Sequence, residues 1–209
     1  MIRLLLADDH DVVRSGLRSI LEERPGWTVV AEASDGKQAV QKSINEKPDV
    51  AILDYSLPLI NGIEATRQIR VRAPTVEVLI FTMHDNETLL RELLRAGARG
   101  YLLKSDTERY LFAAVEALAQ HKPFFTDKAS AALLDIFLKS TSNEDVLTSR
   151  ERGIVQLVAE GYSNKEISRI LNISIKTVES HRATVMRKLK LTSSAALVRY
   201  AVRNKIVEP

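Results

Sequence analysis

Apolar and polar positions alternate regularly along the N-terminal half of the chain. Short continuous apolar runs are typical of strands buried on both faces, and apolar residues three and four positions apart are typical of amphipathic helices. The runs predict five strands: Ile2–Ala7, Thr28–Ala33, Val50–Leu53, Val76–Phe81 and Gly100–Leu103. The spacing predicts a helix after each strand: His10–Glu23, Gly36–Glu46, Asn61–Arg72, Glu87–Arg95 and Thr107–Ala119. This order predicts an α/β fold, a parallel sheet with helices on both faces.

The alternation stops at the Lys-Pro pair that follows residue 121. The change predicts three segments: a domain at residues 1–121, a linker at 122–145 and a second domain at 146–209. Within the linker, Lys128–Leu138 has the composition of a short helix, and the polar residues 139–145 predict a flexible hinge.

The second domain contains only helical spacing, with clear signals for where helices begin. Thr148 followed three residues later by Glu151 is a capping box, and Gly161 marks the end of that first helix. The signals predict an all-α domain of four helices: residues 149–160, 164–171, 175–190 and 193–204. A short helix, a tight turn and a longer basic helix form a helix-turn-helix pattern.

Charge is distributed unevenly between the two domains. Residues 1–121 hold 15 Lys and Arg against 18 Asp and Glu, a net charge of −3, whereas residues 147–207 hold 12 against 4, a net charge of +8. A basic second domain favours a polyanionic partner such as nucleic acid, and the alternative is that its charge serves only solubility.

The cysteine count and the N-terminus exclude several classes. The chain has no Cys, which excludes a disulfide framework and thiolate chemistry. The apolar stretch after Met1 ends at Asp8, too soon for a signal peptide or a membrane span. We therefore expect a cytoplasmic protein with no membrane partner.

The residues that end the predicted strands carry the candidate chemistry. Ligand sites of open α/β sheets lie at the carboxyl ends of the strands, so these residues should meet at one edge. They are Asp8 and Asp9 after the first strand, Asp54 after the third, Thr82 after the fourth and Lys104 after the fifth. A single Asp in such a place is more often a helix cap, and a single Lys is usually a solvated charge. The combination is more specific than either residue alone.

Clustered carboxylates repel one another, and a divalent cation such as Mg2+ relieves that repulsion. We expect Asp9 and Asp54 to hold the ion directly and Asp8 to hold it through water. A free oxygen of Asp54 can then attack a phosphoryl group, with Lys104 and Thr82 contacting the transferred oxygens. No GxGxxG motif follows the first strand, which argues against a dinucleotide site.

Five short motifs of the first domain resemble the receiver domain of response regulators, a flavodoxin-like (βα)5 fold. They are Asp8-Asp9-His10, Leu53 to Pro58, Gly62, Phe81-Thr82 and Gly100 to Lys104. The resemblance implies that Asp54 accepts phosphate from a histidine kinase. It further implies that the Ser56 carbonyl completes the Mg2+ site and that Thr82 and Tyr101 form a switch pair. Two positions depart from the common pattern: Leu57 replaces a methionine, and Ser105 replaces a proline that follows a cis peptide bond.

The longest helix of the second domain separates into two faces. Apolar residues fall within one narrow sector and should pack inward: Ile175, Val178, Val185 and Leu189. Polar and small residues fall opposite: Lys176, Glu179, Ser180, Ala183, Arg187 and Lys190. Small residues let a helix enter the major groove, and cations at its margins reach phosphates. Arg182, near the apolar sector, should extend outward to solvent. The alternative is an ordinary solvated helix face.

Residues 144–207 resemble the LuxR-type DNA-binding domain. The motifs are Leu147 to Glu151, Gly161 to Ile167, Ile173 to Arg182 and Lys188-Leu189. With the receiver motifs, they make the chain similar to NarL/FixJ-type response regulators over nearly its whole length. The resemblance places Glu179, Ser180 and Ala183 at base edges and Lys165, Thr177 and His181 near the DNA backbone. It also implies pairing of two copies through an apolar face of the last helix: Ala195, Ala196, Val198, Ala201 and Val202.

The hypothesis is a response regulator of a two-component system that regulates transcription. Phosphorylation of Asp54 by a sensor histidine kinase would release a recognition helix that is partly covered or wrongly paired, and it would favour a homodimer on double-stranded promoter DNA. RNA polymerase is a further candidate partner. Two alternatives stay open. One is a phosphatase that uses Asp54, for which Ser56 stands where a general acid is needed. The other is an interaction module whose basic domain binds an acidic protein.

Overall fold

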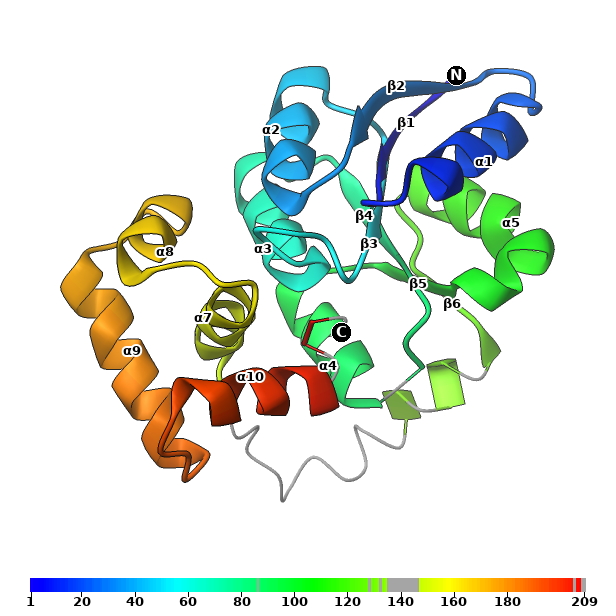
Figure 1. Ribbon diagram of the computed structural model, residues 1–209. Helices are drawn as coiled ribbons and strands as arrows, with labels where there is room; N and C mark the ends of the chain where they lie inside the picture. Colours follow the sequence, from blue (N-terminus) through cyan, green and yellow to red (C-terminus); the bar gives the residue numbers. More distant parts are fainter. Residues whose placement is uncertain (86, 128, 132, 135–146, 205, 208–209) are drawn as a thin grey trace. The chain divides into compact units, whose positions relative to one another are not determined.

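The computed structural model describes residues 1–85, 87–127, 129–131, 133–134, 147–204 and 206–207. The chain divides into two compact units, Met1–Ser142 and Asn143–Pro209 (Figure 1). Within the described residues no helix has the length and apolar character needed to cross a membrane.

The first unit is a parallel sheet covered by helices on both faces, as predicted. Its strands lie in the order β2-β1-β3-β4-β5-β6. They are β1 (Ile2–Ala7), β2 (Trp27–Ala33), β3 (Val50–Asp54), β4 (Glu77–Thr82), β5 (Gly100–Leu103) and β6 (Phe124–Phe125). The helices are α1 (Asp11–Glu22), α2 (Gly36–Glu46), α3 (Gly62–Arg72), α4 (Glu87–Ala96) and α5 (Thr107–Ala119).

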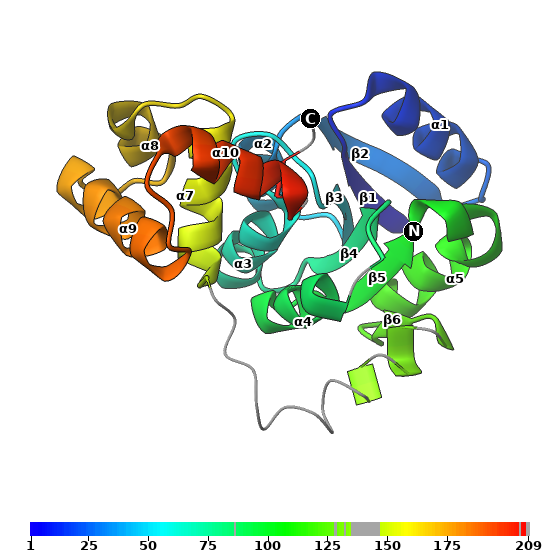
Figure 2. The same cartoon turned by 60° about the horizontal axis from the view of Figure 1, so that its bottom comes forward.

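Helices α1 and α5 cover one face of the sheet, and α2, α3 and α4 cover the other (Figures 1 and 2). On the α1 and α5 face, Leu17 and Leu111 pack with strand residues such as Leu4, Ile52 and Leu79, all at most 6% exposed. The central strands β3 and β4 are buried along their whole length, which explains why their sequences are nearly continuous apolar runs rather than alternating ones.

The sixth strand was not predicted. Phe124 and Phe125 pair in parallel with Gly100 and Tyr101 of β5, inside the segment expected to be linker. Two residues are too few to show any periodicity, so the pattern could not reveal them. The predicted linker helix is helical at residues 127, 129–131 and 133–134, and its remainder and the hinge at 139–145 lie outside the described residues.

The register of the strands aligns the ends of β1, β3, β4 and β5 at one edge of the sheet. Ala7 lies beside Leu53, Asp54 beside Phe81, and Thr82 beside Leu103. The residues that follow these positions therefore leave the sheet at the same edge. After β5 a short 3-10 turn (Lys104–Asp106) leads into α5, with no cis peptide bond in the described part of the chain.

Two glycines allow the loop after β3 to pack closely. A Cβ at Gly36 would lie 1.7 Å from the Ile60 carbonyl oxygen, and one at Gly62 would lie 2.5 Å from the carbonyl oxygen of Asp54. Neither distance is compatible with a side chain, so the loop between β3 and α3 rests directly on the start of α2. That contact holds the backbone next to Asp54 in place.

The second unit has the four predicted helices, each beginning at a hydroxyl N-cap. They are α7 (Ser149–Ala159), α8 (Asn164–Ile170), α9 (Ile175–Lys188) and α10 (Ser194–Arg203). The caps are Thr148, Ser163, Ser174 and Ser193. The capping box at Thr148 and Glu151 is confirmed, and Ser163 forms a second one with Glu166. Val178 and Val185 bury α9 in the core of this unit, both with no exposed surface.

Candidate functional site

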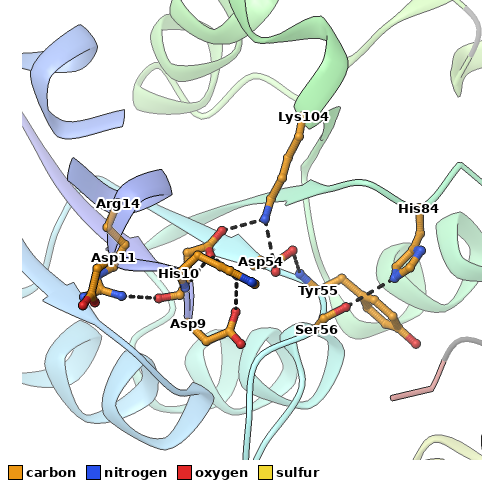
Figure 3. A network of polar contacts seen from close by, with 10 residues as sticks. Asp9, His10, Asp11, Arg14, Asp54, Tyr55, Ser56, His84 and Lys104 are labelled. Carbon is orange, nitrogen blue, oxygen red and sulfur yellow. Dashed lines mark hydrogen bonds and ion pairs between the residues drawn. The ribbon is translucent and has the colours of Figure 1, made fainter. Parts of the chain in front are cut away.

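A lysine and two aspartates form the centre of the acidic edge. The Lys104 Nζ atom lies 2.7 Å from Asp8 Oδ2 and 3.3 Å from Asp54 Oδ2 (Figure 3). Asp8 is 2% exposed and Asp54 5%. Strands β1, β3 and β5 each deliver one of these groups at their tips. The structure therefore brings together residues that the sequence separates by 46 and 50 positions.

The charges at this edge are only partly balanced. Burial raises the pKa of Asp54 to about 6, and the charge of Asp8 adds to this, whereas Lys104 and the Tyr55 amide act in the other direction. Burial disfavours the charged form of Lys104, but Asp54 and Asp8 outweigh it, so the pKa of Lys104 is raised. One ammonium group thus serves two buried carboxylates, and further positive charge would be stabilising.

The cluster formed by Asp8, Asp9 and His10 offers ligand atoms for a cation. One such atom from each residue lies within 4.8 Å of the others. His10 Nδ1 is 2.9 Å from Asp9 Oδ1, and the neighbouring Asp9 and Asp8 carboxylates raise the pKa of His10. Carboxylate oxygens suit a hard divalent cation. The donor set therefore fits such an ion, to which Asp8 and Asp9 would offer carboxylate oxygens. His10 was not predicted as part of the site.

His84 connects the other predicted residues of the edge. The Thr82 hydroxyl accepts a hydrogen bond from the His84 amide at 3.1 Å, and the Tyr101 hydroxyl donates one to the His84 carbonyl at 2.6 Å. The His84 ring lies 3.3 Å from Ser56 Oγ and packs edge-on against Tyr55 (Figure 3). Tyr101 is 4% exposed, and burial, Asp85 and Asp106 raise its pKa. His84 was not predicted as part of the site, because nothing in the local pattern distinguishes it.

In the second unit, the outward face predicted for α9 is exposed. The exposed residues are Lys176, Glu179, Ser180, Ala183 and Arg187 on α9, and Lys165 on α8. Thr177 and His181 are half-buried. Ile175, expected to pack inward, stays 44% exposed. Its position in the first turn of α9 extends beyond the core that Val178 reaches.

Three expectations about the second unit are corrected. Arg182 is half-buried rather than extended freely into solvent: it donates to Asn164 Oδ1 at 2.5 Å and to Ser194 Oγ at 3.2 Å, joining α9 to the first residues of α8 and α10. Lys190 lies beyond the end of α9, with a left-handed φ of 54°. Ala201 is fully buried in the unit's own core and is not part of an outer face of α10.

A second set of polar contacts holds the C-terminal end of α9. Lys188 Nζ donates to Glu151 Oε2 at 2.7 Å, and the same oxygen accepts from the Thr148 amide at 2.7 Å. The carboxylate that caps α7 thus also anchors the last turn of α9. Together, Arg182 and Lys188 fix the orientation of α9 through polar contacts with its three neighbouring helices.

Two families match the chain. The family described as the response regulator receiver domain matches residues 4–116, and that described as bacterial regulatory proteins of the luxR family matches residues 145–201. The chain is 38% identical to the oxygen regulatory protein NreC of Staphylococcus epidermidis, covering 99% of this chain and 100% of that protein. It is 39% identical to NreC of Staphylococcus aureus with the same coverage.

Solved structures agree with these relatives. A LuxR-family response regulator from Aurantimonas sp. is 36% identical, with a TM-score of 0.63 over 66% of this chain and 99% of that one. RcsB from Salmonella enterica serovar Typhimurium, bound to promoter rprA in the presence of phosphomimetic BeF3−, is 27% identical, with a TM-score of 0.67 over 95% of this chain and 97% of that one. The chain belongs to the two-component response regulators that join a receiver domain to a LuxR-type DNA-binding domain.

Proposed function

We propose that Asp54 is the phosphoacceptor and that its modification by a sensor histidine kinase controls binding of α9 to promoter DNA. The observation that carries the proposal is the buried carboxylate of Asp54 with the Lys104 ammonium 3.3 Å away at the tips of parallel strands. A pKa of about 6 leaves Asp54 ionised at neutral pH, as a nucleophile must be. In the transfer, a bond forms between an Asp54 oxygen and phosphorus, and the bond from phosphorus to the kinase histidine nitrogen breaks.

The residues around Asp54 have separate tasks in this proposal. The Tyr55 amide holds Oδ1 at 2.7 Å, which orients the carboxylate. Asp8, Asp9, Asp54 and the Ser56 carbonyl would hold Mg2+, which when bound neutralises charge on the transferred group. Lys104 lies where it can donate to a phosphoryl oxygen. Because the chain supplies positioning and charge rather than further covalent chemistry, slow transfer without a kinase from acetyl phosphate is expected.

The switch would pass through Thr82, His84 and Tyr101. In the present state the Thr82 hydroxyl and the Tyr101 hydroxyl are both bonded to the backbone of His84. A phosphoryl group on Asp54 offers new acceptors to the Thr82 hydroxyl. A shift of Thr82 would therefore move the segment that starts α4, which changes the outer surface around α4, β5 and α5.

The DNA interface would centre on α9. Its exposed residues and the +8 charge of residues 147–207 support this role, as does the family's DNA-bound relative. The proposed contacts are Lys165, Lys176, Thr177, Glu179, Ser180, His181, Ala183, Arg187 and Lys190. A homodimer would form through residues of α10 outside the core, Ala195, Ala196, Val198 and Val202, rather than through the buried Ala201.

The phosphatase alternative has little support from the site. The residue two positions after Asp54 is Ser56, whose hydroxyl contacts His84 Nε2 at 3.3 Å, and a hydroxyl is a poor general acid. We therefore propose that the chain is a regulator without catalytic turnover on external phosphate esters.

Intact mass spectrometry after incubation with acetyl phosphate and Mg2+ tests the proposal. Wild type should gain the mass of one phosphoryl group, and Asp54→Asn should gain none. DNA binding and dimerisation should increase only in the modified wild type. Equal modification of both proteins, or equal DNA binding and dimerisation in all states, would overturn the phosphorylation switch.

A further inference from the structure

Glu179 differs from the other acids of the second unit. Glu151 accepts from Lys188, Glu160 accepts from Gln156 Nε2 at 2.7 Å, and Glu166 accepts from the Ser163 amide at 2.8 Å. Within residues 147–204 and 206–207, Glu179 is the acid that has no hydrogen bond or ion pair. Three of the four carboxylates therefore make contacts within the fold, and the carboxylate of Glu179 is free to contact another molecule.

The position of Glu179 makes its free carboxylate unusual. It is exposed on α9 next to Ser180, and Lys176 lies one turn earlier on the same side without pairing with it. The rest of the unit is strongly basic. A negative charge on a surface that faces phosphates weakens binding to every DNA sequence. Such a charge is useful only where it gains a specific contact.

The hydrogen-bonding groups on base edges limit which bases the Glu179 carboxylate can contact. A carboxylate can only accept hydrogen bonds, and the major groove offers donors at cytosine N4 and adenine N6. The adenine donor lies beside the N7 acceptor, whose lone pair repels a carboxylate, whereas cytosine presents its N4 donor without an acceptor of its own in the groove. An acid on the reading face therefore favours cytosine.

We propose that Glu179 is a specificity-determining residue whose carboxylate accepts a hydrogen bond from the N4 amino group of a cytosine in each half-site. The proposal rests on the proposed function, because it needs α9 to lie in the major groove. Lys176 and Arg187 on the same helix then neutralise phosphates, whereas Glu179 lowers affinity for all DNA sequences and increases discrimination between base pairs. Loss of such a contact costs on the order of tenfold in affinity for the matching site.

Selection of bound sequences from a random duplex DNA pool tests this, using the full chain treated with acetyl phosphate and Mg2+. Wild type should enrich a motif with a C·G pair at one fixed position of each half-site. Glu179→Ala should lose the preference at that position alone. Glu179→Gln should shift it to adenine, because an amide pairs with adenine N6 and N7 together.

Two controls separate the outcomes. Glu160→Gln removes the same charge at the C-cap of α7 and should leave the motif unchanged, and Lys176→Ala should weaken binding to all sequences alike. Thermal melting should be the same for wild type and both Glu179 variants, since this side chain has no hydrogen-bond or ion-pair partner among the described residues. An identical motif for wild type, Glu179→Ala and Glu179→Gln overturns the role of Glu179 while leaving DNA binding intact. A wild type that enriches no motif overturns the proposed function and this inference together.

Discussion

The two units each bury a carboxylate next to a lysine, but they treat it in opposite ways. Asp54 is 5% exposed and its pKa is raised to about 6, because burial dominates and Lys104 is shared with Asp8. Glu151 is 4% exposed, yet its pKa is lowered: burial opposes the charge, but Lys188 and the Thr148 amide and hydroxyl outweigh it. A fully bonded carboxylate stabilises a fold, whereas one with unsatisfied charge is ready to react or to bind a cation.

The largest expected effect concerns the loop that supports Asp54. Gly36→Ala places a methyl group 1.7 Å from the Ile60 carbonyl oxygen, so the loop after β3 must move. We expect a loss of about 3 kcal/mol or more in the free energy of unfolding, measured by urea denaturation. A variant that unfolds like wild type would show that this loop is not tightly held.

The next largest effect is expected when the fully bonded carboxylate of Glu151 is removed. Glu151→Gln loses the ion pair with Lys188 and weakens the cap of α7, at a cost of about 1–3 kcal/mol in the free energy of unfolding. Phosphorylation by acetyl phosphate should be unchanged, because the change lies in the other unit. An unchanged melting temperature would contradict the structural role of Glu151.

Removing the charge of Asp54, which is only partly balanced, should stabilise the fold rather than destabilise it. Asp54→Asn should raise the free energy of unfolding at pH 7 without Mg2+, by about 1–3 kcal/mol, since it removes a buried charge. A raised folded-state pKa means that the folded chain binds more protons between pH 4 and 6, so wild-type stability falls as pH rises through this window.

The advantage of Asp54→Asn over wild type should therefore be small at pH 4 and complete above pH 6, as followed by denaturation at several pH values. For Glu151 the direction is reversed: its lowered pKa stabilises the fold at neutral pH, and this contribution is lost as the pH falls through the acidic range. An advantage that is independent of pH would refute the difference between the two carboxylates.

A smaller effect on DNA binding distinguishes a residue that positions α9 from a residue of α9 that contacts DNA. Arg182→Ala loses the ties to Asn164 and Ser194, which should weaken specific DNA binding on the order of fivefold without removing a phosphate contact. The slope of log affinity against log salt should then equal that of wild type, whereas Lys176→Ala should reduce it by about 1. A reduced slope for Arg182→Ala would mean that Arg182 contacts the DNA directly.

The smallest expected effect is a gain in stability. A Cβ at Gly153 meets nothing within 4 Å, and the residue lies in the middle of α7. Gly153→Ala should raise the free energy of unfolding by about 0.5–1 kcal/mol through helix propensity, as calorimetry can measure. The same substitution thus has opposite signs at Gly36 and Gly153. Destabilisation by Gly153→Ala would point to a backbone conformation that disfavours a side chain.

Local patterns were sufficient for most elements and for the acidic edge. Runs of four to six residues predicted five of the strands, and hydroxyl caps marked the starts of α7 and α9. Parallel strands place their carboxyl ends on one edge, so Asp8, Asp54 and Lys104 could be predicted to meet. The two-residue strand β6 and the role of His84 left no local signal.

The amino-acid sequence by itself determined the order of elements, the identity of the acidic site and the basic character of the second unit, because these follow from short-range periodicity and from residue type. Only the tertiary structure decided which partners the long side chains find. Arg182 meets residues 18 positions before it and 12 after it, and Lys188 meets one 37 positions away. Helical periodicity shows which way a residue faces, but the angle at which helices cross decides what it touches, and that angle depends on the packing of the whole unit.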